Sequence, residues 1–134
     1  ASGSADGALT WNTVLNITAD GRGLSQFTAK SWCNFNGTGT VAIRDSHNVS
    51  SITDNGTGDY TANFSNNLGS TNYSVSFSVF SGNTDGNRGA SGAQFYNASP
   101  AVGNFRMFTA YGSTESAVGA KEDPSIVTFQ VFGD

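Results

Sequence analysis

Apolar and polar residues alternate along much of this chain with a period of two, which is typical of a β-strand with one buried face. The pattern is clearest in segment 73–79, YSVSFSV, where every second residue is apolar and the residues between them are all serine. No stretch repeats its apolar residues at the helical spacing of about 3.6 residues. We therefore expect an all-β, antiparallel, β-sandwich-like domain.

Two copies of the tetrapeptide NGTG, at 36–39 and 55–58, lie between segments with this alternation. Asn-Gly between alternating apolar runs is the strongest short-range hairpin signal, because a tight turn needs positive φ angles, which cost Asn and Gly least. The sequence thus predicts two successive hairpins. Their strands are expected over 27–35 and 40–45, and over 49–53 and 59–64.

Four further strands are predicted over 73–79, 92–97, 105–111 and 126–132. The strands over 73–79 and 105–111 are separated by a segment rich in Gly, Asn and Ser. Loops of this length without a function are uncommon in compact domains. We divide the chain into an N-terminal junction or stalk-derived segment, 1–24, and a β-sandwich-like distal domain, 25–134. Because the chain starts with Ala rather than Met, it is expected to be part of a longer polypeptide.

The last two predicted strands carry apolar residues on both faces. An outward apolar row on a sheet is a liability unless another surface covers it. We interpret this set as the core and subunit interface of a homotrimer: Phe105, Met107, Phe108, Ile126, Phe129 and Phe132. A fully covered pair of central strands in a single chain is the alternative.

The first half of the chain closely resembles a known family. The lead-in GRGLSQFT, the core WCNFNGTGTVAIRDS and the continuation NVSSITDNGTGDYTANF are similar to a module near the C-termini of bacteriophage tail fibres and related virion-associated proteins. Cys33 and Ala62 stand where the family pattern typically has valine, and neither disturbs the alternation. The resemblance fades beyond about residue 81, so it implies a β-rich fold and an extracellular, trimeric tail-fibre setting in the virion but no binding residue.

Composition narrows the possible partners. The net charge is −4 and only 12% of residues are charged, which argues against nucleic acid and anionic membranes, since both require basic patches. No apolar run approaches transmembrane length, so membrane insertion is not expected. The single cysteine allows no intrachain disulfide, and Cys33 is expected to be a small buried hydrophobe.

Groups that could carry catalysis are few. The single Cys and single His could form a Cys33–His47 pair, although the strand position of Cys33 favours packing. Glycoside hydrolysis needs two carboxylates in a cleft, and four are candidates: Asp45, Asp54, Asp59 and Asp85. Asp54 and Asp59 flank a turn, where Asp supports hairpin geometry without chemistry. We expect no catalytic residues and no cofactor.

The sequence raises two further types of site, a metal site and glycosylation sites. No clustered spacing predicts a metal site within one chain, although three copies of His47 could meet on the threefold axis of a trimer. Seven Asn-X-Ser/Thr triplets could signal glycosylation. We attribute them to composition, since Asn36 and Asn55 are already explained as turn residues.

Recognition of a neutral sugar fits the composition best. Amides, hydroxyls and short carboxylates bind sugar hydroxyls, and aromatic faces pack on the apolar face of the ring. Segment 81–104 contains such a set, and its candidate receptor-binding residues are Asn83, Asp85, Asn87, Arg88, Gln94 and Tyr96. Tyr96 is preferred to Phe95 as the exposed aromatic, because adjacent strand residues face opposite ways. An ordinary surface loop with Phe95 in the core is the alternative.

The expected function is that of a phage tail fibre distal domain that trimerises and binds bacterial surface polysaccharide, either lipopolysaccharide or capsule, or another outer-membrane receptor. A structural knob or trimerisation module without a receptor site is the first alternative. A polysaccharide-degrading enzyme domain is the second.

Overall fold

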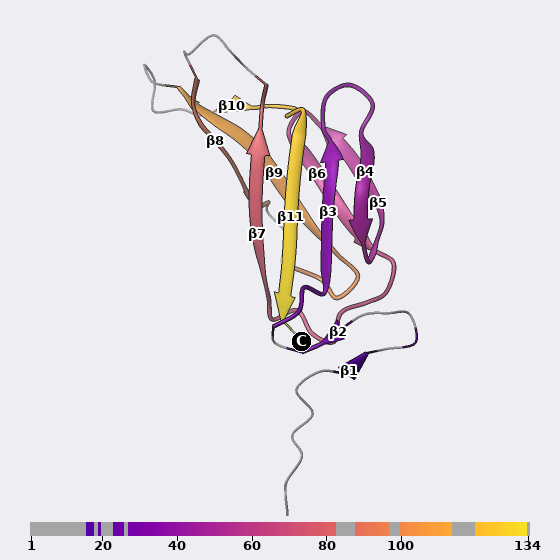
Figure 1. Ribbon diagram of the computed structural model, residues 1–134. Helices are drawn as coiled ribbons and strands as arrows, with labels where there is room; N and C mark the ends of the chain where they lie inside the picture. Colours follow the sequence, from indigo (N-terminus) through magenta and orange to yellow (C-terminus); the bar gives the residue numbers. More distant parts are fainter. Residues whose placement is uncertain are drawn as a thin grey trace, which may run out of the picture.

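Figure 1 shows a computed structural model of the chain. It describes residues 16, 17, 19, 23–25, 27–82, 88–96, 100–113 and 120–133, of which 16, 23, 24, 88–91 and 113 by their backbone only. These residues form eleven strands and no helix. Accordingly, this part of the chain has no helix long and apolar enough to cross a membrane.

The strands make two main antiparallel sheets that lie against each other as two layers (Figure 1). The first sheet has the order β4-β3-β11-β7, from Ala42–His47, Ser31–Asn36, Ile126–Gly133 and Tyr73–Phe80. The second has the order β5-β6-β9-β8, from Val49–Gly56, Asp59–Phe64, Asn104–Ser113 and Arg88–Phe95. The expected all-β, antiparallel fold is confirmed, and the two layers are consistent with a β-sandwich.

Three short strands complete the description. β10, Ala120–Lys121, pairs with β9 at Tyr111 and Ala110. β8 pairs with one edge of β9 at these residues, so β10 pairs with the other edge. That is the edge with which β6 pairs earlier along β9. β1, Asn16–Ile17, and β2, Gly23–Leu24, pair with each other, and their ribbon lies at the same end of the sandwich as the C-terminus (Figure 1).

Both predicted hairpins are present, as the antiparallel pairs β3–β4 and β5–β6. The corner between them was not predicted. Asn48 has a φ of 55° and turns the chain from the first sheet into the second; Asn tolerates this region better than most residues. Its side-chain amide donates hydrogen bonds to the carbonyl oxygens of Lys30 and Asn66, both at 3.1 Å.

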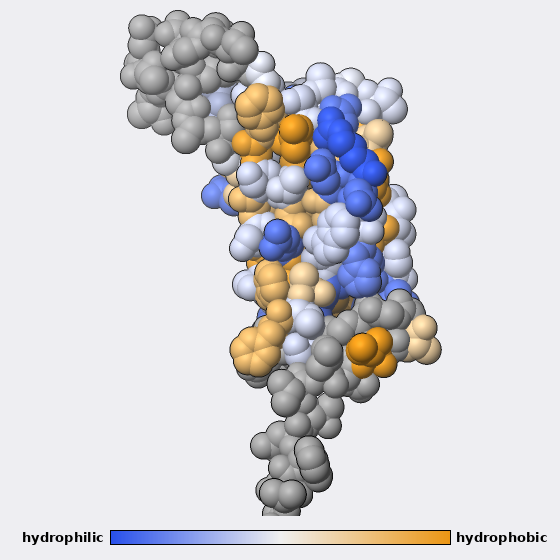
Figure 2. Space-filling view, viewed as in Figure 1, coloured by the Kyte–Doolittle hydropathy of each residue, from blue (hydrophilic) through white to orange (hydrophobic). Residues whose placement is uncertain are grey.

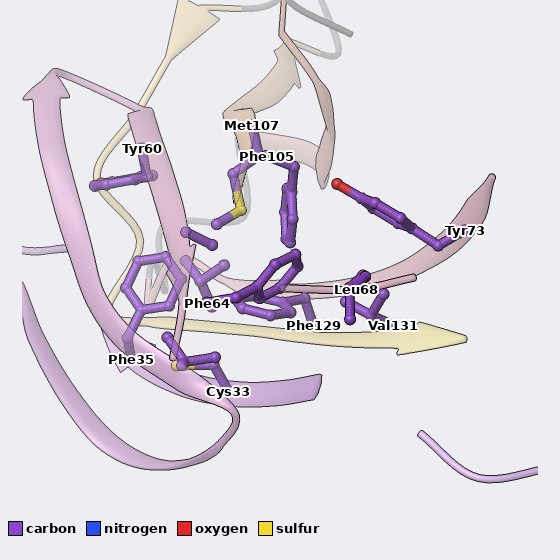
Figure 3. Close-up of a cluster of buried hydrophobic side chains, with 13 residues drawn as sticks. Cys33, Phe35, Tyr60, Phe64, Leu68, Tyr73, Phe105, Met107, Phe129 and Val131 are labelled. Carbon is purple, nitrogen blue, oxygen red and sulfur yellow. The ribbon is translucent and has the colours of Figure 1, made fainter. Parts of the chain in front are cut away.

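The core lies between the sheets and follows from the alternation, because every second residue of the central strands points inward. Phe105 lies at its centre, 5.0 to 6.4 Å from the ring centroids of Phe64, Tyr73, Phe77, Phe95 and Phe129. Figure 3 shows Phe105 with Phe64, Tyr73 and Phe129, and Tyr60 and Phe35 lie beside them, packed edge to face at 5.2 Å. Cys33 is buried in the same cluster, as expected.

Residues 122–125, which we call the crossover strap, carry the chain from β10 in the second sheet to β11 in the first. The strap passes between the two NGTG turns. The Gly37 N–H donates to the Pro124 carbonyl at 2.9 Å. On the other side, the Gly58 N–H and the Tyr60 hydroxyl both donate to Asp123 Oδ1 at 2.7 Å. The strap is therefore hydrogen-bonded to both hairpins.

Each NGTG copy supplies one glycine that lets the strap pass. A Cβ atom on Gly37 would lie 2.6 Å from the Tyr60 hydroxyl oxygen and 2.9 Å from the Pro124 carbonyl oxygen. A Cβ on Gly58 would lie 2.7 Å from the Glu122 carbonyl oxygen of the strap and 2.5 Å from the Thr109 carbonyl oxygen of β9. Gly39 and Gly56 face open space and have positive φ angles. Positive φ thus falls on glycines, whereas Asn36 acts through its side chain, donating to the Thr38 carbonyl at 2.6 Å.

The two boundaries that differ most from the sequence prediction are the starts of two strands. The strand predicted over 92–97 is longer at its start, since β8 begins at Arg88, opposite Ser113 of β9. The strand predicted from residue 27 begins only at Ser31, and Phe27 is 82% exposed. Position 97 and loop residues 114–119 lie outside the described residues.

Gly58 and Gly39 form a matched pair for testing the strap, because both have φ near +60° but only Gly58 is crowded. We expect Gly39→Ala to lower the free energy of unfolding by about 1–2 kcal/mol through its left-handed backbone alone. Gly58→Ala should cost about 1–3 kcal/mol more, because the methyl group displaces backbone. Urea unfolding followed by circular dichroism measures both losses. Equal losses would contradict the close approach of the strap.

Candidate functional site

The structure describes two of the six candidate receptor-binding residues with their side chains, Gln94 and Tyr96. Asn83, Asp85 and Asn87 lie outside the described residues. Arg88 is described by its backbone, which pairs with Ser113 at the start of β8. The local geometry therefore has to be built outward from Gln94 and Tyr96.

Gln94 and Tyr96 share the outer face of the second sheet. Gln94 is directly opposite Phe108 of β9, and the Tyr96 N–H donates to the Arg106 carbonyl at 3.0 Å. Residues opposite each other in an antiparallel pair lie on the same face. Phe95 points the other way and packs against the core, where its ring contacts Phe105 at 5.8 Å and Phe77 at 6.1 Å, although Phe95 itself stays 36% exposed.

A charge cluster lies beside them on this face, centred on Asp59 at the start of β6. The Asp59 side chain is only 8% exposed. Arg106 contacts it through two nitrogens, Nε at 2.7 Å and Nη2 at 2.9 Å, and Lys121 Nζ lies at 3.3 Å. The hydrogen bonds from Arg106 are the largest influence and lower the pKa of the Asp59 carboxyl. Partial burial opposes this shift, and Lys121 adds to it.

Both cations of the cluster also contact Tyr96. Lys121 Nζ lies 3.8 Å from the centroid of the Tyr96 ring, and the Arg106 guanidinium carbon lies 5.0 Å from it. The edge-to-face packing of Phe108 on the same ring, at 5.4 Å, adds a further contact. A ring in contact with a cation at this distance makes a cation–π interaction, so the ring face beneath Lys121 is not open to a sugar.

Sequence reasoning missed this role of Lys121. The position of Lys121 depends on β10 pairing with β9 opposite Ala110. No local pattern predicts a two-residue strand added to a sheet edge.

A shallow depression of about 320 Å³ lies next to the cluster, between β8 and β9. It is lined by Gly92, Ala93, Gln94, Phe108, Ala110, Tyr111 and Gly112. The small residues among these leave room beside the Phe108 ring, and a Cβ on Gly92 would meet nothing within 4 Å. The volume is near the lower limit of small-ligand sites. An apolar floor with one amide at its rim can hold a single sugar ring weakly.

The Cys33–His47 pair suggested by the sequence does not form. Cys33 points into the core, whereas His47 lies opposite Trp32 on the outer face of the first sheet. Burial, with a smaller contribution from Asp45, raises the pKa of the Cys33 thiol to about 12, so the thiol stays protonated at neutral pH. A protonated, buried thiol is a poor nucleophile.

The candidate carboxylates have structural partners. Asp54 Oδ1 accepts the Gly56 N–H at 2.9 Å, Asp45 Oδ1 accepts the Ser46 N–H at 2.8 Å, and Asp59 belongs to the charge cluster. Asp85 lies outside the described residues. In the part of the chain that the structure describes, no three His, Cys, Asp or Glu side chains are grouped so that they could hold a metal ion.

The six predicted core and interface residues divide into two groups. Phe105, Met107 and Phe129 are buried in the core of the single chain. The other three lie on outer faces: Phe108 packs against Tyr96 on the second sheet, and Ile126 and Phe132 lie on the first. Ile126 is 37% exposed and is opposite Phe80, which is 60% exposed and was not predicted as an interface residue.

Comparisons with protein-family models, with curated proteins and with solved structures find no match to this chain. The geometry of its own residues is therefore the basis for assigning a function.

The charge cluster predicts how stability depends on pH. A carboxyl whose pKa is lowered by folding contributes stability above its unfolded pKa of about 3.9, and loses it as pH falls through the folded pKa. We expect the melting temperature to fall in acid below about pH 4. Asp59→Asn should lower the melting temperature at pH 7 and flatten this acid-side fall. Asp45→Asn, at an exposed position of β4, is the matched control. Calorimetry at closely spaced pH values measures both slopes, and an unchanged slope in Asp59→Asn would contradict the role of this cluster.

Proposed function

We propose that this chain is the distal domain of a bacteriophage tail fibre, which assembles as a homotrimer and binds bacterial surface polysaccharide, either lipopolysaccharide or capsule, during host adsorption. The likeness of residues 21–64 to tail-fibre sequences supports the setting. In this proposal the domain works outside the cell, as part of the virion, and carries out no catalysis.

The observation that carries the proposal is that the two ends of the sandwich differ. The C-terminus and the β1–β2 ribbon lie at one end, and the β3–β4 turn and the start of β8 lie at the other (Figure 1). A fibre shaft joined through residues 1–24 would leave the second end directed away from the virion. Hydrogen bonds between the crossover strap and both NGTG turns stabilise that end. A rigid surface loses less conformational entropy on binding.

The depression beside Gln94 supports sugar binding of modest strength. A shallow site for one sugar ring is worth about 4 kcal/mol, which corresponds to a millimolar Kd. Three linked copies raise the apparent affinity by roughly 100-fold to 10,000-fold without any new contact. A trimer of weak sites is therefore sufficient for reversible adhesion to a repetitive polysaccharide.

Exposed apolar residues support assembly. Phe80 and Ile126 are neighbours across β7 and β11 at one end of the outer face of the first sheet, four residues along β11 from Gln130. Phe108 lies on the opposite, second-sheet face. A cyclic trimer joins one patch of a subunit to a different patch of the next, so apolar residues on two faces are compatible with threefold assembly.

An array of purified bacterial O-antigens and capsular polysaccharides, probed with the fluorescently labelled domain, tests the proposal together with native mass spectrometry. We expect a mass of three 13.9 kDa chains and binding to at least one polysaccharide. Gln94→Ala should weaken that binding at least fivefold while leaving the trimer intact. A trimer that binds no polysaccharide would indicate the structural knob instead. A monomer would contradict the assembly, and new reducing ends in the bound polysaccharide would indicate an enzyme.

A further inference from the structure

The outer face of the first sheet carries a tryptophan that the site described above does not use. Trp32 of β3 is partly exposed, opposite His47 of β4 on one side and Gln130 of β11 on the other. Gln130 is in turn opposite Ser76 of β7. With strands about 4.8 Å apart, this row crosses roughly 14 Å of the sheet. Figure 2 looks onto this face, where polar surface covers much of the centre.

The polar groups of this row are available to a ligand. In the part of the chain that the structure describes, the side chains of Trp32, His47 and Gln130 make no hydrogen bond. Arg44 differs, since its guanidinium donates to the Ser125 carbonyl at 2.6 Å and to the Asn34 side-chain oxygen at 3.3 Å. An aromatic ring flanked by an unpaired imidazole and an unpaired amide is suited to a sugar, whose rings present apolar faces and hydroxyl edges.

A second depression, of about 120 Å³, lies between β7 and β11 on this sheet. It is lined by Ser76, Phe77, Ser78, Thr128, Phe129 and Gln130. The short side chains of the alternate serines of β7 leave room for this hollow. Gln130 links it to the ring, because Gln130 lines the depression and is opposite Trp32.

The charges of this face favour an uncharged ligand. Asp45 and Arg44 are neighbours of opposite sign on β4, and Arg44 is already bound to backbone and amide oxygens. Trp32, Gln130 and Ser76 in the rest of the row carry no charge. A polyanion would lack a cationic patch here, and a polycation would lack an anionic one.

We propose that the outer face of the first sheet, centred on Trp32, is a second sugar-binding surface for a segment of uncharged polysaccharide. Trp32 packs against a sugar ring, and His47 and Gln130 hydrogen-bond its hydroxyls. The ligand class rests on the proposed function, but the surface is on the opposite side of the sandwich from Gln94. A polysaccharide could thus contact the domain at two independent places.

The fluorescence of Trp32 can report whether a sugar is bound to this surface. The chain has two tryptophans, so Trp11→Phe leaves Trp32 as the single emitter. We expect at least one neutral polysaccharide among dextran, mannan and galactan to change its emission at millimolar sugar concentration. Polygalacturonate, a charged polysaccharide, should change it less. Acrylamide should quench Trp32 in the assembled protein, and the bound polysaccharide should reduce that quenching.

Variants in affinity electrophoresis, with the same polysaccharides in the gel, test the residue assignment. Trp32→Ala should lower the affinity at least tenfold, and Trp32→Tyr should restore most of it, which separates loss of the ring from loss of folding. Phe27→Ala is the matched control, because it removes an aromatic ring that is 82% exposed outside both surfaces. Far-UV circular dichroism checks that each variant folds.

Three results would overturn the inference: no response to any of the neutral polysaccharides, an effect of Trp32→Ala no larger than that of Phe27→Ala, or no acrylamide quenching in the assembled protein. The last would make this face a subunit interface. If O-antigen binding depends on Gln94 but not on Trp32, the inference fails and the proposed function stands. If dextran, mannan or galactan binding depends on Trp32 while the O-antigen and capsule array stays negative, the proposed bacterial receptor is wrong and the second surface stands.

Discussion

The passage of the crossover strap between the two NGTG turns is the constraint on which the rest of the sandwich depends. The strap leaves the second sheet after β10 and enters the first sheet as β11, and on this path its backbone passes close to Gly37 and Gly58. Asp123 Oδ1 accepts hydrogen bonds from Gly58 and Tyr60, so the strap also orients a buried aromatic residue. Both sheets are joined at this end through backbone contacts that side chains would obstruct.

The register of β11 follows from this constraint and determines what each face presents. β11 enters between β3 and β7 with Phe129 opposite Cys33 and Phe77, pointing into the core. The same register places Gln130 next to Trp32 on the outer face. A slip of one residue would exchange these two rows, and the interior would lose the ring that contacts Phe105 at 5.0 Å. Core packing and outer-surface chemistry therefore depend on the same alignment.

The sequence predicts local features of the fold well and distant ones poorly. The β3–β4 and β5–β6 hairpins join neighbouring segments, so turn residues and alternation are sufficient to predict them. The insertion of β11 between β3 and β7 pairs residues about a hundred positions apart in the case of Val131 and Ser31, and no short-range pattern encodes it. Asn48 illustrates an intermediate case: Asn is favoured at positive φ, but the residue lies between two strands and lacks a neighbouring glycine that would mark a turn.

In the candidate site, too, local features could be predicted from the sequence and distant pairings could not. Strand alternation is enough to place Gln94 and Tyr96 on one face and Phe95 on the other. It cannot show that Arg106 and Lys121 contact the Tyr96 ring, because Lys121 arrives there only through the pairing of β10 with β9. Trp32 was within reach of the sequence, since it occupies the position of β3 that alternates with the buried Cys33. As part of a predicted hairpin strand it was given no surface role, and the proposal of a second sugar-binding surface rests on its outward position among polar neighbours.

The two outer faces of the sandwich differ in a way that bears on adhesion. On the second sheet, ion pairs and cation–π contacts tie the charged groups near Tyr96 to one another, so a ligand on the Tyr96 ring would have to displace existing contacts, whereas a ligand in the depression beside Gln94 would not. On the first sheet, the polar side chains of the row through Trp32 make no hydrogen bond within the described residues, so a ligand there adds hydrogen bonds without breaking any. Since exchange with water leaves each hydrogen bond worth only about 1 kcal/mol, a face that loses no internal contact on binding has the advantage. The row through Trp32 thus offers a neutral sugar more readily available groups than the Tyr96 ring does.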